Sequence, residues 1–485
     1  FHLTIKNKNE QMKQLTIILS VFLFASCSKD LESLNTNIKD ATLASGESFF
    51  NMASKNMADA MHGITYGSGG SPWETTRLIA QQISSVTYNE GTTYFSQFTW
   101  TNIYRGVLKN LEESSKATSE APAVGAAGLT RQKNQLALIE IFTVYAYSTL
   151  VESFGNIPYN EALDIENVLP KYDDAKTVYT DLIARLTVAI NNLDVTGKSF
   201  DADIIYKGNV GNWKKFANSL KLNMGMRIIE ADPTLGSATV VAAAPGAFSS
   251  NADNAVFKYL TAPPNMNPLW TSLAVGNRRD FVAAKPFVDL MNTTNDPRRG
   301  VFFTTVNSAF IGAPSGVVVT YESYSRYSEK FYQPDLPGII LDYATVEFLL
   351  AEAAERSIIG TPATAQSHYN KAITASLEYY GVASAAAAYI SQPAVAYNTA
   401  PGTWKKKIGL QKWLALFNQG TEAWTEYRRL DFPELAAPPR SFINVVPKRL
   451  TYPISEQTLN GANYQKAASD VGSDLMTTKL FWDKQ

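Results

Sequence analysis

The sequence predicts a mainly α-helical fold, built as a single large α-helical domain with irregular loops and a few short β-strands. After Ser45, apolar residues recur at spacings of three and four, which is the pattern of amphipathic helices. Eight of the expected helices follow one another as four pairs. A length of 485 residues gives a prior of about three domains, but no compositional break divides the helical pattern.

The four helix pairs carry most of the periodic signal. They are expected at 103–116 with 130–154, 174–193 with 212–230, 342–358 with 362–380, and 405–417 with 420–429. Pairs of this length resemble tetratricopeptide units, although a clean repeat is missing. In the second pair, Asp173 and Asp174 precede an apolar stripe that ends at Leu193, and the helix dipole favours negative charge there. Further helices are expected at 48–61, 78–85 and 285–291.

The segment 231–338 has a different character, because it is rich in Gly, Pro, Asn and Thr. It contains short β-prone runs at 301–306 and 317–320. We therefore expect a loop and short-strand insertion within a helical domain that spans 46–485. The alanine-rich segment 382–402 is expected to be a loop.

Charge and composition exclude several classes of protein. The 43 basic and 44 acidic residues give a net charge of −1, whereas nucleic-acid binders usually carry a basic excess. Charged residues make up only 18% of the chain, while Phe, Trp and Tyr reach 12%. A surface with few charges and many rings suits neutral polar ligands such as sugars.

Histidine and cysteine are too scarce for several kinds of site. The chain has three histidines, His2, His62 and His368, and one cysteine, Cys27. A transition-metal site built on these residues would lack ligands, and a disulfide framework or a Cys-His nucleophile pair is equally excluded. We expect no cofactor and no catalytic residue, and the sequence leaves open whether calcium binds among side-chain oxygens.

The front of the chain reads as a targeting segment. Residues 1–11 precede Met12 and are interpreted as upstream translation, and 12–26 as a lipoprotein signal peptide with a short positive start and an apolar run. Cys27 follows two small residues and resembles the bacterial lipoprotein processing site, although Phe24 stands where leucine is commoner. Acyl chains on Cys27 would hold the protein on a membrane, with 27–45 as a tether.

Several strings occur in the order typical of one family. They are ESFGNIPYNEAL (152–163), YTDLIARLTVAINNLD (179–194), DIIYKGNVGNWKKFANSLKLNMGMRI (203–228), DPRR (296–299), YATVEFLLAE (343–352) and RLTYPISEQTLNGANY (449–464). With the Cys27 site, they resemble the SusD/RagB family and most closely its second, SusD-like subgroup in Bacteroidota. The resemblance implies an outer-membrane lipoprotein that is exposed at the cell surface and attached to the membrane through lipid only. It also implies a TonB-dependent, SusC-like transporter as partner and an oligosaccharide or polysaccharide as ligand, with no nucleic acid.

Ligand contacts are expected from aromatic rings in loops, because rings on helix stripes are used in the core. Trp73 lies in a glycine-rich segment with Tyr66 nearby, and Trp270 lies in a proline-rich segment followed by Asn277 and Arg278. The candidate ligand residues are Tyr66, Trp73, Trp270, Asn277, Arg278, Tyr324 and Tyr327.

Other strings have structural interpretations. Glu347, Glu352 and Glu355 share one expected helix, and salt bridging is favoured over a glycosidase acid–base pair. Trp213 and Arg227 are expected to pack between helices. A surface glycoside hydrolase and a helical-repeat scaffold that binds only proteins are the two alternative functions to non-catalytic capture.

Overall fold

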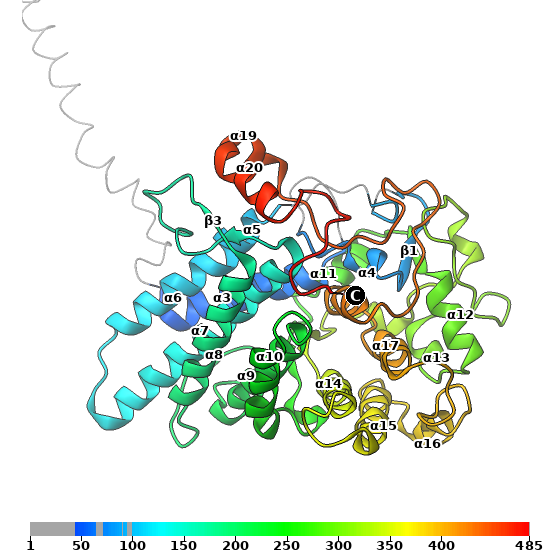
Figure 1. Ribbon diagram of the computed structural model, residues 1–485, viewed down its shortest axis with the longest axis horizontal. Coiled ribbons are helices and arrows are strands. Elements are labelled where there is room, and N and C mark those ends of the chain that lie inside the picture. Colours follow the sequence, from blue (N-terminus) through cyan, green and yellow to red (C-terminus); the bar gives the residue numbers. More distant parts are fainter. Residues whose placement is uncertain (1–43, 65–70, 90, 95–98, 485) are drawn as a thin grey trace, which may run out of the picture. The chain divides into compact units, whose positions relative to one another are not determined.

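Packed pairs of helices make up most of the chain in the computed structural model, which describes residues 44–64, 71–89, 91–94 and 99–484 (Figure 1). Residues Gly46–Gln485 form one unit. The long helices are α3 (Gly46–His62), α6 (Lys109–Glu120), α7 (Gly125–Phe154), α8 (Ala175–Asn192), α9 (Val210–Arg227), α10 (Pro233–Ala243), α14 (Tyr343–Glu355), α15 (Pro362–Tyr379), α17 (Trp404–Ala415) and α18 (Gly420–Leu430). The expected mainly helical fold is confirmed.

Shorter helical elements lie between and after these. They are α4 (Thr76–Ile79), α5 (Thr101–Ile103), the π-helical turn Tyr104–Leu108, α11 (Pro268–Trp270), α12 (Lys285–Thr293), α13 (Arg299–Phe302), α16 (Ala386–Ile390), α19 (Ile454–Leu459) and α20 (Gly461–Asp470). Three antiparallel strand pairs accompany them. They join β1 (Ile83–Ser85) to β5 (Phe281–Ala283), β2 (Ile157–Pro158) to β3 (Tyr172–Asp173), and β4 (Ala255–Phe257) to β6 (Gly338–Leu341).

The four predicted helix pairs are present, and the members of each pair pack on each other. They are α6 with α7, α8 with α9, α14 with α15, and α17 with α18. Contacts between α7 and α8 and between α9 and α14 join successive pairs into one layer. Side-chain caps begin several of the helices: Asp174 accepts from Thr177 N at 2.8 Å to start α8. The acidic start predicted for this helix is therefore a true N-cap.

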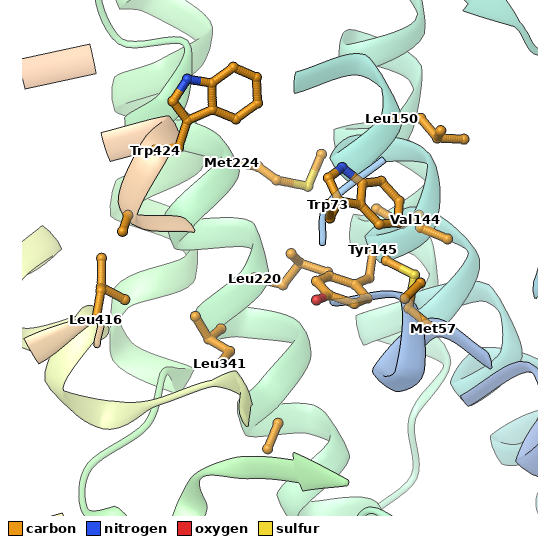
Figure 2. Packing of buried hydrophobic residues seen from close by; sticks show 14 of the residues in the cluster. Met57, Trp73, Val144, Tyr145, Leu150, Leu220, Met224, Leu341, Leu416 and Trp424 are labelled. Atoms are coloured by element: carbon orange, nitrogen blue, oxygen red, sulfur yellow. The ribbon is translucent and has the colours of Figure 1, made fainter. Parts of the chain in front are cut away.

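Helix α7 contributes many buried residues to the core. It is long and apolar enough to cross a membrane by composition, but 72% of its most apolar window is buried inside the fold. It ends at Gly155, whose φ of +85° a residue with a side chain rarely adopts, and β2 follows. Figure 2 shows side chains from α3, α7 and α9, among them Met57, Tyr145 and Met224, meeting around Trp73.

Two local predictions are wrong. The run 301–306 is expected as a strand, but its start lies in α13, where Val301 N and Phe302 N donate to Arg298 O at 3.0 and 2.9 Å. The stretch 78–85 was expected as one helix. Its helix ends at Ile79, since Gln81 adopts a φ of +49° and the chain then enters β1.

Other segments depart less from expectation. Within the described residues, 317–320 forms no strand, although Val319 N donates to Val86 O at 3.1 Å. The expected loop 382–402 contains the short helix α16. Helices α10, α19 and α20 were not predicted, because they are short or carry weak apolar stripes.

A buried network of charged side chains ties the helix pairs together. Glu426 of α18 contacts Lys412 Nζ of α17 at 2.8 Å, Arg429 Nη2 at 2.6 Å, and Arg227 of α9. Arg429 also pairs with Glu352 of α14 at 2.5 Å. These side chains are almost fully buried, so the structural interpretation of Glu352 and of Arg227 is confirmed.

Candidate ligand-binding surface

Four chain segments that are far apart in sequence converge in the described structure. We call them the loop face: 86–89, 268–284, 309–327 and 438–446. Backbone hydrogen bonds connect them to one another and to the loop that holds Thr93. The bonds run from Val86 N to Asp280 O (2.8 Å), from Val319 N to Val86 O (3.1 Å), from Ala313 N to Ala283 O (2.8 Å) and from Phe442 N to Thr93 O (2.9 Å). Because these bonds fix the backbone, the side chains of the loop face have defined positions.

Tryptophan exposure singles out one residue of the loop face. All eight tryptophans lie in the described part of the chain, and six of them are buried, whereas Trp270 and Trp404 are partly exposed. Trp270 ends the short helix α11. Asn267 caps this helix by accepting from Leu269 N at 2.8 Å, and its own amide donates to Leu336 O at 2.7 Å. The ring of Trp270 is therefore presented to solvent from a backbone turn that is tied down.

Two polar candidates come after the π-helical turn Thr271–Val275 that follows Trp270. Asn277 is exposed and adopts a left-handed φ of +46°. Arg278 is partly exposed; it pairs with Asp280 through two hydrogen bonds of 3.0 and 2.5 Å and lies 4.6 Å from the ring centroid of Phe281. An amide, an oriented guanidinium and an indole ring on one segment provide the kinds of group that bind the hydroxyls and the CH face of a sugar.

The tyrosine candidates divide between surface and core. Tyr324 is partly exposed and packs against a small apolar cluster that contains Val86 and Val282. Tyr327 is only 3% exposed, and its ring lies 5.3 Å from Phe331 and 5.8 Å from Phe417. The expectation of a ligand contact is wrong for Tyr327, because its ring is buried and packs against other core rings.

The expectation is also wrong for Trp73. This side chain is 0% exposed, and its indole N–H donates to Ser153 Oγ of α7 at 2.9 Å. Its ring packs in the core among side chains such as Met57 and Tyr145 (Figure 2). Tyr66 and Cys27 lie outside the described residues.

Two exposed rings of the loop face were missed. Phe442 is 66% exposed and Tyr88 is 57% exposed. Both stand in loops, Phe442 after a Pro-Pro-Arg-Ser run and Tyr88 just after β1. The criterion that selected Trp270, a ring in a loop, applies equally to them.

A buried polar cluster lies near the loop face. Arg77 is buried and donates to Asn418 Oδ1 at 2.5 Å and to His62 O at 2.9 Å. Burial raises the pKa of Glu74 to about 7, although the charges of Arg77 and Arg278 act in the opposite direction. A carboxyl with this pKa is partly protonated at neutral pH, which reduces the cost of its burial.

The glutamates of α14 are held in structural bonds. Glu347 contacts His368 Nδ1 at 2.6 Å, Glu352 pairs with Arg356 and Arg429, and Glu355 accepts from the hydroxyl of Tyr397. The salt-bridging interpretation is therefore confirmed for Glu352, while Glu347 is held by hydrogen bonds with His368 and Tyr343. Among the described residues, no group of three or more His, Cys, Asp or Glu side chains is arranged to hold a metal ion.

Comparisons with known proteins agree on one family. The profile of the SusD-like_2 family, described as starch-binding and associating with the outer membrane, matches residues 39–453. A chitin-binding protein of known structure is 26% identical, with a TM-score of 0.74, and the match covers 91% of this chain and 100% of that chain.

Two further solved structures share the fold. A chitin-binding SusD homologue from Flavobacterium johnsoniae is 24% identical, with a TM-score of 0.73 over 90% of this chain and 98% of that chain. A SusD homologue from Bacteroides uniformis is 23% identical, with a TM-score of 0.76 over 90% of this chain and 100% of that chain. No curated protein matches the chain.

Proposed function

Since this chain belongs to the SusD-like_2 family of nutrient-binding proteins associated with the outer membrane, we propose that it captures an oligosaccharide at the cell surface without catalysis. The captured sugar passes to a TonB-dependent, SusC-like transporter. The partly exposed ring of Trp270, held on a fixed turn within the loop face, is the observation that carries the proposal.

The mode of binding follows from the groups on the loop face. The CH face of a sugar ring packs against the indole of Trp270, while Asn277 and Arg278 bond its hydroxyls. Binding of this kind is an equilibrium: a ligand enters, is held by several weak contacts, and leaves intact. Two similar solved structures are of chitin-binding proteins, which makes a chitin oligosaccharide the first ligand to test.

Attachment to the membrane is part of the same proposal. Acylation of Cys27 would supply more than one lipid chain, which is what stable anchoring of a protein on a membrane requires. The segment from Cys27 to residue 45 would then act as a tether for the folded unit that begins at Gly46.

Trp270→Ala is expected to weaken the binding of chitohexaose about ten- to a hundredfold, because truncation removes the ring that stacks on the sugar. Titration calorimetry with the purified protein measures the change. Trp404→Ala is the matched control, since Trp404 is the other partly exposed tryptophan and contacts Arg356, which follows α14. The assignment of the binding site to the loop face is contradicted if both variants lose affinity equally, or if Trp270→Ala binds chitohexaose as tightly as the wild type.

A further inference from the structure

Two neighbouring pockets outside the loop face share one lining residue, Tyr379. Tyr379, the last residue of α15, lines two pockets of about 440 and 300 Å³. Ile339 of β6 lines the first pocket and Val256 of β4 lines the second, and these two residues are paired across the two strands. The pockets are therefore neighbours across a two-stranded sheet, and together we call them the Tyr379 groove.

The walls of the Tyr379 groove combine rings with amides. Phe331 and Tyr380 contribute rings to the first pocket, and Tyr206 to the second. Tyr379 is partly exposed and is held in place by edge-on packing against Tyr380, with ring centroids 5.1 Å apart. Side-chain amides come from Gln333 and Asn418 in the first pocket and from Asn212, Asn251 and Asn254 in the second.

The lining of this groove carries more lysines than carboxylates. Three lysines line it, Lys330 in the first pocket and Lys207 with Lys258 in the second. Each is exposed, and none of them forms an ion pair within the described residues. Asp335 is the one carboxylate among the described residues that line either pocket. The groove is thus locally cationic in a protein whose net charge is −1.

Of the other ionisable groups at the groove, His62 is neutral and Glu378 offsets part of the charge of these lysines. Burial lowers the pKa of His62 to about 4, so its ring is neutral at pH 7, and its Nε2–H donates to Ile339 O at 3.0 Å. Glu378 lies beside the second pocket and accepts from the Asn251 amide at 3.3 Å. Gly381 N and Val382 N donate to the last carbonyls of α15, which reduces the partial negative charge at the C-terminus of that helix.

The backbone that presents Lys207 is fixed before any ligand arrives. Asp203 accepts from the N–H groups of Tyr206 at 2.8 Å and Ile205 at 3.0 Å. Lys207 has a left-handed φ of +53°, and Gly208 follows it, where an added Cβ would lie 1.8 Å from Phe200 O. A lysine on such a loop loses little backbone freedom on binding, which favours affinity.

We propose that the Tyr379 groove is a second binding site, specific for an acidic oligosaccharide. A carboxylate or sulfate group lies over Lys207 and Lys258, and a sugar ring packs on Tyr379. The amides of Asn212 and Gln333 are placed to bond its hydroxyls. None of the residues that line the groove belongs to the loop face, so the two sites share no side chain.

The test uses two acidic probes and one neutral probe in titration calorimetry with the purified protein. Tetragalacturonate carries carboxylates, a chondroitin sulfate tetrasaccharide also carries sulfates, and the methyl ester of tetragalacturonate is the neutral match. We expect at least one acidic probe to bind about tenfold or more tightly than the ester, and to weaken as salt rises from about 50 to about 200 mM. The double variant Lys207→Gln/Lys258→Gln should lose about tenfold in affinity for that probe.

The control is the double variant Lys116→Gln/Lys371→Gln, which removes the same charge from exposed lysines outside both pockets. It should leave affinity within about twofold. Trp270→Ala should also leave the acidic probe bound, which separates this site from the loop face. The proposal is overturned if neither acidic probe binds, or if both double variants bind it equally. Either result leaves chitohexaose binding by Trp270 untouched.

Discussion

Trp73→Ala is expected to destabilise the protein by about 3–5 kcal/mol, which would place it among the most damaging single substitutions in the chain. The indole is wholly buried among side chains of α3, α7 and α9, so truncation leaves a cavity (Figure 2). It also leaves Ser153 without the N–H that bonds its hydroxyl at 2.9 Å. The cavity and the lost hydrogen bond both lower the free energy of unfolding.

Urea unfolding followed by circular dichroism measures this loss. Trp404→Ala serves as the control and should cost far less, because Trp404 is partly exposed and is the first residue of α17. If Trp73→Ala keeps nearly all of its stability but loses chitohexaose binding, Trp73 contacts the ligand. The assignment of its side chain to the core is then contradicted.

Glu426→Gln is expected to cost about 3–5 kcal/mol, because it removes one partner of a buried ion network and leaves the other charges in place. Lys412, Arg429 and Arg227 all contact this carboxylate, and all are almost fully buried. The amide of glutamine has nearly the same shape, so packing changes little and the loss reports charge. Glu434→Gln is the control: its side chain is 72% exposed beside Lys406, and it should change stability by less than about 1 kcal/mol.

The same network predicts how stability responds to acid. Burial alone would raise the pKa of Glu426, but Arg429, Lys412 and Arg227 outweigh it and hold the pKa well below its ordinary value. The stabilisation is therefore present above the ordinary carboxyl pKa and is lost as pH falls below it. The acid limb of the stability curve should be steeper for the wild type than for Glu426→Gln. Parallel curves would show that Glu426 contributes no such linkage.

Helix pairing could be predicted from the sequence because each helix carries its own apolar stripe. The stripe from Val178 to Ile190 became the buried face of α8, and Asp174 became its cap. The run 301–306 was wrongly predicted as a strand because its residues are β-prone. In the fold, the buried carboxylate of Asp296 accepts from Arg298 N just before α13, and the chain turns into a helix there. Local propensity yields to tertiary contacts at such positions.

The candidate site was only partly predictable. Glycine and serine around Trp73 indicate a loop but do not say whether its ring turns outward or inward, and burial decided against Trp73 and Tyr327. Trp270 remains a candidate because its turn is capped at the surface. The lysines of the Tyr379 groove come from three separate segments, so only the folded chain brings them together.

Capture without bond breaking is the central claim, and one experiment tests it most directly. The purified protein is titrated with chitohexaose, maltohexaose and cellohexaose, and each mixture is then incubated and analysed by mass spectrometry. The account predicts saturable binding of at least one hexasaccharide, which is recovered intact and bound more weakly by Trp270→Ala. Shorter sugars that accumulate with time in the presence of the protein would contradict it, as would the failure of all three sugars to bind.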